Sequence, residues 1–294
     1  MAGSPRPLPL PPGLVEAAER DGRTEWLGTL PATVARLAEA WLLTVEAPFF
    51  PGGQTAWVAP ARSHTGAELV LKVAWAHPEA LHEADGLRAW DGRGAVVLHA
   101  SADCGGDTTA LLLEHCRPGT PLAALPEPEQ DDVVARLLLR LWDAPTAGLP
   151  FRPLATMCAQ WADEFAAGVA AEPRLVDPGL AREGIALFRD LPADADRQVL
   201  LATDLHAGNV LAAQREPWLL IDPKPYLGDP TYDALQHLLN CERLHADPAG
   251  LADRLAGLLD LDAARLRRWL FARCVQEAPE RPPLAGLARR IPLD

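Results

Sequence analysis

Lysine is almost missing from this chain. Of its 27 lysine and arginine residues, only Lys72 and Lys224 are lysines. A composition rich in Arg, Ala and Pro is typical of a GC-rich coding sequence. A lysine that is retained against this bias is expected to do something that arginine cannot, because its ammonium is a compact point charge whereas a guanidinium is a planar fork.

A basic surface is missing too. The formal net charge is -13 at pH 7, whereas proteins that bind nucleic acids present basic patches to the phosphates. We therefore expect no nucleic-acid partner. Acidic clefts attract cations, so the charge is compatible with a cationic small molecule, although an acidic surface that only maintains solubility would explain most of it.

Long apolar runs and paired cysteines are also absent. No run approaches the roughly 20 apolar residues of a membrane span, and the Pro-rich start lacks the apolar core of a signal peptide. We expect a cytoplasmic chain without membrane contacts, with a loose arm over residues 1–12 and enough apolar residues to bury a full core. The cysteines lack the spacing of a disulfide framework or a zinc site: Cys104, Cys116, Cys158, Cys241 and Cys274.

Three polar residues have a spacing that predicts a chemical site. Asn209 lies five positions after Asp204, and Asp222 follows the next apolar segment. The runs 209–213 and 218–221 are typical of two paired strands, which would bring Asn209 and Asp222 to one end of a hairpin. An Asp that orients a hydroxyl, with an Asn and a second Asp that hold Mg²⁺, is the arrangement used in phosphoryl transfer. The alternative is an ordinary polar hairpin.

The apolar segment 68–73 predicts a buried strand that contains Lys72. Kinase-like folds carry a phosphate-contacting lysine on such a strand. The alternative is a lysine whose stem lies along a sheet edge. Residues 78–90 predict a helix on which Glu83 lies in an apolar stripe. We predict an ion pair between Lys72 and Glu83, with Glu79 as the alternative partner.

The rest of the pattern predicts an α+β chain. A turn that contains Gly52 and Gly53 separates two strand-like segments. Such a turn can lie over phosphates, because glycine lets the backbone approach closely, or it can be a plain hairpin turn. Amphipathic segments predict helices over residues 32–41, 131–142 and 153–171, and Asp262 is placed to cap a last long helix.

Five segments show that the chain resembles the aminoglycoside phosphotransferases, in the branch of the streptomycin 6-kinases and hydroxyurea phosphotransferases. The resemblance covers most of the chain and implies a bilobal protein-kinase-like fold. A small N-terminal lobe over 1–114, with an antiparallel sheet and a helix, would bind the nucleotide. A larger, mostly helical lobe over 115–294 would carry catalysis and the acceptor. The segments are 204–211 (DLHAGNVL), 218–225 (WLLIDPKP), 228–233 (GDPTYD), 87–96 (LRAWDGRGAV) and 111–119 (LLLEHCRPG).

The resemblance implies roles for individual residues. Asp204 would be the catalytic base, and Lys72, with Glu83 as its partner, would contact the phosphates of ATP or GTP. Asn209 and Asp222 would bind Mg²⁺. The remaining implied residues are Glu114, His115 and Cys116 in an interlobe hinge against the adenine, and Asp233, which would brace the catalytic loop through backbone N–H groups.

One position departs from the family pattern. The family commonly has His-Gly ahead of the catalytic Asp, whereas this chain has Ala202 and Thr203. Because that His usually braces the loop, its loss puts the order of the loop in doubt but not the class of reaction.

The acceptor site is less clearly indicated. A streptomycin-like acceptor carries guanidinium groups, which pair with carboxylates and stack on aromatic rings. Each candidate alone could equally be a surface carboxylate, a core aromatic or a loop-packing residue. Lys224 could face the phosphates or pair with an acidic neighbour, and the sequence does not decide between them. The candidates are His206, Asp163, Glu164, Trp161, Glu242 and Glu277.

These patterns together predict a Mg²⁺-dependent kinase that transfers the γ-phosphoryl group of ATP to a hydroxyl of a small cationic molecule, with streptomycin or a related aminoglycoside as the first candidate. One alternative keeps the chemistry but takes hydroxyurea or a secondary-metabolite intermediate as the acceptor. The other alternative is a nucleotide-binding pseudokinase. We expect a monomer or a dimer.

Overall fold

The computed structural model describes residues 8–293, and within this part the chain forms two compact units. Unit 1 comprises residues 8–92 and 96–117, and unit 2 comprises residues 93–95 and 118–293. The chain makes its last passage from unit 1 to unit 2 between Arg117 and Pro118. The boundary proposed from the sequence, after residue 114, lies three residues earlier.

Unit 1 is built on a five-stranded antiparallel sheet with the order β1-β2-β3-β5-β4. Its central strand β3 is buried at every position after the first, which explains its nearly continuous run of apolar residues. The strands are β1 (Leu43–Val45), β2 (Ala56–Ser63), β3 (Glu68–Trp75), β4 (Leu98–Gly105) and β5 (Thr108–Glu114).

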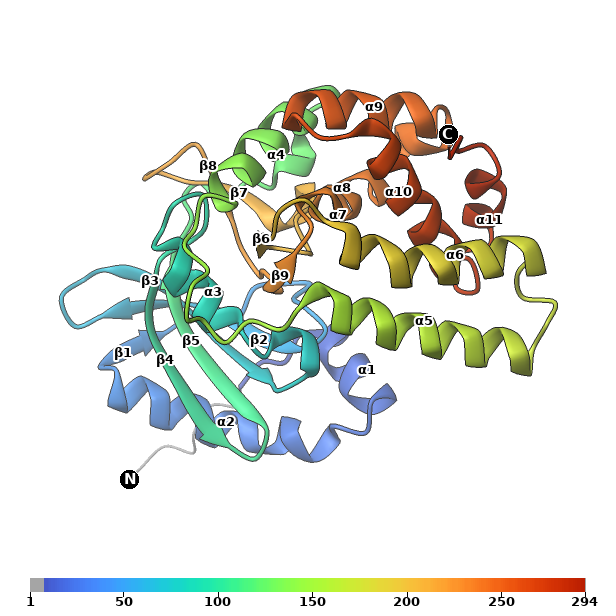
Figure 1. Cartoon of the computed structure of the whole chain (residues 1–294). Coiled ribbons are helices and arrows are strands. Elements are labelled where there is room, and N and C mark those ends of the chain that lie inside the picture. Colours follow the sequence, from blue (N-terminus) through green and yellow to red (C-terminus); the bar gives the residue numbers. More distant parts are fainter. Residues whose placement is uncertain (1–7, 294) are drawn as a thin grey trace. The chain divides into compact units, whose positions relative to one another are not determined.

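Helices α1 (Pro12–Arg20) and α2 (Thr24–Ala40) cover one face of this sheet (Figure 1). Their apolar residues share a core with Trp57, Leu71 and Val73 of the sheet. The helix expected over 32–41 is the C-terminal part of α2. The expectation for 78–90 was wrong at its start: a short 3-10 turn, η1 (Pro78–Ala80), precedes α3 (Glu83–Trp90).

The start of the chain is less loose than the sequence predicts. Residues 1–7 of the expected arm lie outside the described residues, but residues 8–12 pack against unit 1. The indole Nε1 of Trp57 donates a hydrogen bond of 2.9 Å to the Pro9 carbonyl. Pro11 is buried and α1 already begins at Pro12. The arm is therefore corrected for these residues, because apolar side chains among the prolines find partners on the sheet.

Unit 2 contains two small antiparallel ribbons and a set of helices. One ribbon pairs β6 (Val199–Leu201) with β9 (Tyr226–Gly228), and the other pairs β7 (Val210–Ala212) with β8 (Trp218–Leu220). The second ribbon confirms the hairpin expected over 209–221. No helix among residues 8–293 combines the length and the apolar character needed to cross a membrane.

The helices of unit 2 follow the predicted amphipathic segments closely. Helix α4 begins four residues before the predicted start, at Glu127 rather than Asp131, with Pro in its first turn. The Asp262 side chain accepts hydrogen bonds from the N–H groups of Ala264 and Arg265, as expected of a helix cap. The helices are α4 (Glu127–Leu141), α5 (Leu154–Ala171), α6 (Pro178–Asp190), α7 (Pro230–Asp233), α8 (Leu235–Leu239), α9 (Pro248–Leu259), α10 (Ala263–Glu277) and α11 (Pro283–Ala288), with short 3-10 turns η2 (Leu122–Ala124), η3 (Leu191–Asp194), η4 (Ala207–Asn209) and η5 (Glu242–His245).

Candidate functional site

In unit 1, Lys72 forms the predicted ion pair with Glu83. Strand residues alternate between faces, and since Leu71 and Val73 face α1 and α2, Lys72 points to the opposite face, toward α3. Its Nζ lies 2.7 Å from both carboxylate oxygens of Glu83. Both side chains are buried. The side chain of Glu79, the alternative partner, lies outside the described part.

This pair is unlike a surface salt bridge. Two charges removed from water lose several kcal/mol of hydration each, which their attraction barely offsets. The lysine is also one of only two in the chain. Stability alone is therefore a weak reason for the pair, and a lysine held in one pose suits a role as a fixed positive charge.

The glycine turn lies between β1 and β2 of the same unit. Gly52 has a φ of +80°, in the left-handed region where a side chain is strained, and a Cβ built there would lie 2.5 Å from the Cβ of Pro11. Both glycines are exposed. At Gly53 a Cβ would meet nothing closer than 3.9 Å, so the structure requires glycine only at the first of the two positions.

The segment proposed as the hinge follows β5. Glu114 is tied to Val97 twice, because its N–H donates to the Val97 carbonyl (2.9 Å) and its Oε2 accepts from the Val97 N–H (3.0 Å). His115 packs edge-on against the ring of Phe49, with centroids 6.1 Å apart. Burial and the nearby Arg117 lower the pKa of His115. Cys116 is buried, and its sulfur is a thiol rather than half of a disulfide.

In unit 2, the loop between β6 and β7 carries Asp204, and the side chain of Asp233 holds the start of this loop. The buried Asp233 carboxylate accepts hydrogen bonds from the N–H groups of Ala202 (3.0 Å) and Thr203 (2.6 Å). It also accepts one from the indole Nε1 of Trp142 (3.0 Å). These are the backbone contacts that the proposed bracing role requires.

Thr203 accounts for how the loop stays ordered without the family His. Its φ is +48°, which is uncommon for a β-branched residue. Two contacts offset this strain: the Thr203 N–H bonds Asp233, and the hydroxyl donates to the Lys224 carbonyl at 2.5 Å. The Lys224 N–H in turn donates to the Ala202 carbonyl at 2.9 Å. The loop is thus braced from two sides.

Asp204 lies among polar partners at the centre of this loop. The Asn209 amide Nδ2 donates to the Asp204 carbonyl at 3.0 Å and lies 3.4 Å from its Oδ2. The Lys224 ammonium lies 3.0 Å from the same Oδ2. Lys224 therefore pairs with an acidic neighbour, and the neighbour is Asp204 itself. Among residues 8–293 no hydrogen bond is directed to Oδ1, so this oxygen can accept a proton from a bound hydroxyl.

Asn209 and Asp222 lie at the same end of the β7–β8 hairpin. The Ile221 N–H donates to the Asn209 carbonyl at 2.9 Å, which extends the ribbon by one pair. Asp222 is exposed and has a φ of +52°, a conformation that Asp tolerates better than most residues. Because the Asn209 amide donates its nitrogen to Asp204, its oxygen is left for a cation. An amide oxygen and a carboxylate are hard ligands that fit Mg²⁺.

His206 begins the short turn η4 and contributes to the loop. Its Nδ1 accepts a hydrogen bond of 3.1 Å from the Gly208 N–H. A side chain at Gly208 would collide with the imidazole, since a Cβ there would lie 2.8 Å from Cε1. Burial lowers the pKa of His206, so the ring is neutral at pH 7. The loop-packing alternative thus has a contact to support it.

Three of the proposed acceptor carboxylates are exposed. Asp163 and Glu164 lie on the outer side of α5, where Asp163 pairs with Arg189 at 2.7 Å and Glu164 accepts from the Gln160 amide at 2.8 Å. Glu242 lies at the start of η5, and its side chain is also exposed. All three are accessible to a ligand.

The other two acceptor candidates contact a guanidinium that belongs to the protein. The Arg273 guanidinium lies 4.8 Å from the centroid of the Trp161 ring and donates to Glu277. It also donates to the Tyr232 hydroxyl at 2.6 Å, and Glu277 has a second partner in Arg281 at 2.9 Å. The predicted chemistry, a guanidinium on a ring and a carboxylate, is present, but it serves internal packing. Both residues are thus already engaged by arginines of the protein.

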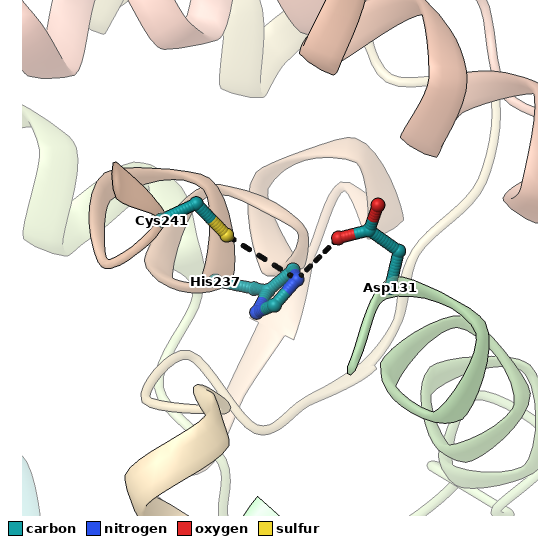
Figure 2. A group of neighbouring side chains, drawn as sticks. All are labelled: Asp131, His237 and Cys241. Carbon is teal, nitrogen blue, oxygen red and sulfur yellow. Dashed lines mark hydrogen bonds and ion pairs between the residues drawn. The ribbon is translucent and has the colours of Figure 1, made fainter. Parts of the chain in front are cut away.

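A second polar cluster lies buried in unit 2 (Figure 2). His237 Nε2 lies 2.9 Å from Asp131 Oδ1 and 3.6 Å from the Cys241 sulfur. The three potential ligand atoms lie within 4.8 Å of one another. Metal binding is nevertheless disfavoured. Arg243 and Arg254 already donate to both Asp131 oxygens, so the carboxylate is committed to these two arginines, and burial raises the pKa of the Cys241 thiol to about 12.

Sequence reasoning missed two contacts of the Asp204 loop and one buried carboxylate of the second polar cluster. The Lys224–Asp204 pair depends on how two loops meet, so no local signal indicates it. Trp142 was expected on an apolar stripe, and its N–H toward Asp233 has no sequence signature. The sequence did contain a signal for Asp131. It lies on the buried stripe of α4, three residues before Val134, where a charged side chain is unexpected.

An antiparallel sheet with a buried Lys–Glu pair, followed by a helical unit with a braced Asp loop, defines a protein-kinase-like phosphotransferase. Solved structures agree on the fold. The aminoglycoside phosphotransferase APH(4)-Ia superposes with a TM-score of 0.61 at 16% identity, over 90% of this chain and 98% of that one. APH(3'')-Id from Streptomyces rimosus, solved with ADP and streptomycin, gives a TM-score of 0.55 at 18% identity, over 83% and 97%.

Sequence relatives identify the family. The model of the aminoglycoside/hydroxyurea antibiotic resistance kinases matches residues 40–280. The hydroxyurea phosphotransferase of Kitasatospora aureofaciens is 40% identical, over 91% of this chain and 78% of its own length. The streptomycin 6-kinase of Streptomyces glaucescens is 34% identical, over 92% and 89%. The chain belongs to this family and is a small-molecule phosphotransferase, which confirms the resemblance and the fold class inferred from the sequence.

Proposed function

We propose that this protein transfers the γ-phosphoryl group of ATP to a hydroxyl of a small acceptor, and that streptomycin or a related aminoglycoside is the first acceptor to test. The observation that carries the proposal is the arrangement around Asp204. One of its carboxylate oxygens is held by Lys224 and Asn209, and the other is left open for a hydroxyl.

In the proposed reaction, Asp204 orients the acceptor hydroxyl and takes its proton as the new oxygen–phosphorus bond forms. The bond to the β-phosphate breaks and ADP leaves. Lys72, fixed by Glu83, supplies a positive charge to the nucleotide phosphates. Asn209 and Asp222 would hold Mg²⁺, which supplies charge stabilisation on the transferring phosphate when bound. Asp233 and Thr203 keep the loop in place.

Support for a cationic acceptor comes from exposed carboxylates in the acceptor-carrying unit. Asp163, Glu164 and Glu242 are accessible, and carboxylates bind guanidinium groups bidentately. Only Glu242 among them has no side-chain partner among the described residues. It is therefore our first candidate for an acceptor contact.

A second acceptor, hydroxyurea, has a specific observation in its favour. The relative named for hydroxyurea is 40% identical, whereas the one named for streptomycin is 34% identical. A small neutral acceptor would also need fewer carboxylates, and the commitment of Trp161 and Glu277 to Arg273 removes two of the groups that a guanidinium-bearing acceptor could use.

The test is ADP release from MgATP with streptomycin and with hydroxyurea, checked by a mass gain of one phosphate on the acceptor. We expect turnover with one of the two and a loss of at least about a thousandfold in Asp204→Ala, as expected when a group that acts in the transition state is removed. Nucleotide binding should survive in the variant. Turnover near the wild-type rate in Asp204→Ala would overturn the assigned base, and no transfer to any acceptor would favour a pseudokinase.

A further inference from the structure

The backbone of Lys224 is constrained by its two neighbouring residues and by two hydrogen bonds. It lies between Pro223 and Pro225, and a proline restricts both its own φ and the backbone of the residue before it. Its N–H donates to the Ala202 carbonyl at 2.9 Å, and its carbonyl accepts from the Thr203 hydroxyl at 2.5 Å. The position of this lysine is therefore determined by the same loop that carries Asp204.

The Lys224 side chain ends at the reacting group. Its Nζ lies 3.0 Å from Asp204 Oδ2, and the two side chains are 29% and 14% exposed. A partly exposed ion pair adds little stability, typically below about 1 kcal/mol. A purely structural role thus gives a weak reason to keep one of two lysines at this place. An ammonium has three N–H donors, and at 29% exposure this side chain is accessible to an anion in addition to Asp204.

Other cations of this segment do not serve Asp204. Between Ala202 and Tyr226 the sequence contains one arginine, Arg215, besides Lys224. Arg215 donates to the Ala95 carbonyl at 2.9 Å and to Glu216 at 3.2 Å. The His206 ring is engaged within its own turn, since its Nδ1 accepts from the Gly208 N–H. Within this segment, Lys224 is therefore the cation that can balance the negative charge on the phosphoryl group as it is transferred to the hydroxyl.

We propose that Lys224 is a catalytic residue whose ammonium bridges Asp204 and the transferred phosphoryl group. This inference rests on the proposed function. The ammonium stays protonated throughout: one N–H remains on Asp204 Oδ2 and holds the carboxylate in place, while another donates to a phosphoryl oxygen. The hydroxyl proton passes to Asp204, the new oxygen–phosphorus bond forms, and the bond to the β-phosphate breaks.

This role predicts discrimination between nucleotides that carry the third phosphate and those that do not. In Lys224→Met the affinity for AMP-PNP with Mg²⁺, measured by titration calorimetry, should fall about tenfold, as expected for one charge-assisted hydrogen bond. The affinity for ADP should stay within about twofold of wild type, because ADP lacks the contacted group. The kcat should fall about a hundredfold, with the KM for the acceptor little changed, since the contact strengthens in the transition state.

Three further variants make the result decisive. Lys224→Arg keeps the charge but replaces the compact ammonium by a planar fork, so it should recover only part of the AMP-PNP affinity. Lys224→Gln replaces Lys224→Met if the latter does not fold. Arg268→Met removes an exposed positive charge from the same unit and should leave both nucleotide affinities and kcat unchanged.

Two outcomes would overturn the inference alone. One is an equal loss, or no loss, for AMP-PNP and ADP in Lys224→Met. The other is a kcat near that of the wild type. A wild-type chain that binds neither adenine nor guanine nucleotides would instead remove the proposed function and, with it, this inference.

Discussion

At the scale of single residues, Asp233 holds the start of the loop that carries Asp204. Burial raises its pKa to about 6, against three N–H donors that favour the ionised form. Those donors come from two neighbouring loop residues and from Trp142 of the segment after α4. A carboxylate with two acceptor oxygens can satisfy all three, and no other side chain of this size can.

We therefore predict that Asp233→Asn is much less stable than wild type. Two of the three donors converge on Oδ2, so an amide nitrogen at either position would leave at least one buried N–H unpaired. The free energy of unfolding should fall by roughly 3 kcal/mol, and turnover should fall with it. Denaturant unfolding followed by tryptophan fluorescence measures the change.

The matched control for this substitution is Asp196→Asn, because Asp196 is exposed in the same unit. It should unfold at the wild-type midpoint. An Asp233→Asn midpoint equal to that of the control would show that the loop does not depend on the carboxylate.

Residue-scale prediction from the sequence succeeded where local periodicity carried the information. The Lys72–Glu83 pair followed from a strand lysine and a helix face, and both elements are local. It left Lys224 undecided between the phosphates and an acidic neighbour, because its partner Asp204 lies twenty residues away in the sequence, next to the left-handed backbone of Thr203. A single sequence gives no signal for such a backbone conformation at a threonine.

At the scale of elements, Asp131 ties α4 to the chain that follows it. His237 belongs to α8, Arg243 to η5 and Arg254 to α9, and all three donate to the Asp131 carboxylate. Burial alone would raise the pKa of Asp131, but these hydrogen bonds outweigh it and lower the pKa from 3.8 to about 2. The carboxylate is thus a junction of four elements.

The lowered pKa predicts a specific loss of stability in acid. Because the folded protein holds this proton more weakly than the unfolded chain, the contribution of Asp131 is fully present above about pH 5 and is lost as the pH falls toward 2. It amounts to about 2 kcal/mol. Urea unfolding at a series of pH values should show this decline in wild type, and Asp131→Asn should lack it while being less stable at pH 7.

Asp132→Asn provides the control for this junction, because Asp132 contacts Arg254 from an exposed position. It should keep the wild-type decline between pH 5 and 2. The same decline in Asp131→Asn would assign the acid sensitivity to other carboxylates.

Element prediction was accurate for regular segments and poor at their ends. The β7–β8 hairpin and the Asp262 cap were found as expected, because both depend on residues that are close together in the sequence. The predicted helix start at residue 78 and the predicted loose arm over residues 8–12 were wrong. For residues 8–12 the proline-containing segment takes its structure from tertiary partners, such as the Trp57 indole that donates to the Pro9 carbonyl.

At the scale of the whole molecule, the net charge of -13 bears on the choice of acceptor. A negative protein attracts cations over a distance that salt shortens, from a Debye length of about 30 Å at 0.01 M to about 8 Å at 0.15 M. Streptomycin carries guanidinium groups, whereas hydroxyurea is neutral.

We therefore predict that raising the salt concentration at saturating MgATP lowers kcat/KM severalfold for a cationic acceptor and leaves it unchanged for hydroxyurea. Steady-state kinetics over a sodium chloride series measures the slope, with a viscosity control in sucrose. A cationic acceptor whose kcat/KM ignores salt would show that the charge of the molecule serves solubility alone.

The exposed positions of Asp163, Glu164 and Glu242 also bear on how this family diversifies. Substitutions at such positions usually change stability by less than about 0.5 kcal/mol, whereas the loop residues described above each serve several partners at once. Under the proposed function, substitutions at these exposed positions would change the acceptor contacts at little cost in stability, whereas substitutions in the Asp204 loop would disturb several contacts at once. Such a division of roles would let relatives at 40% and 34% identity carry the names of two different acceptors, hydroxyurea and streptomycin.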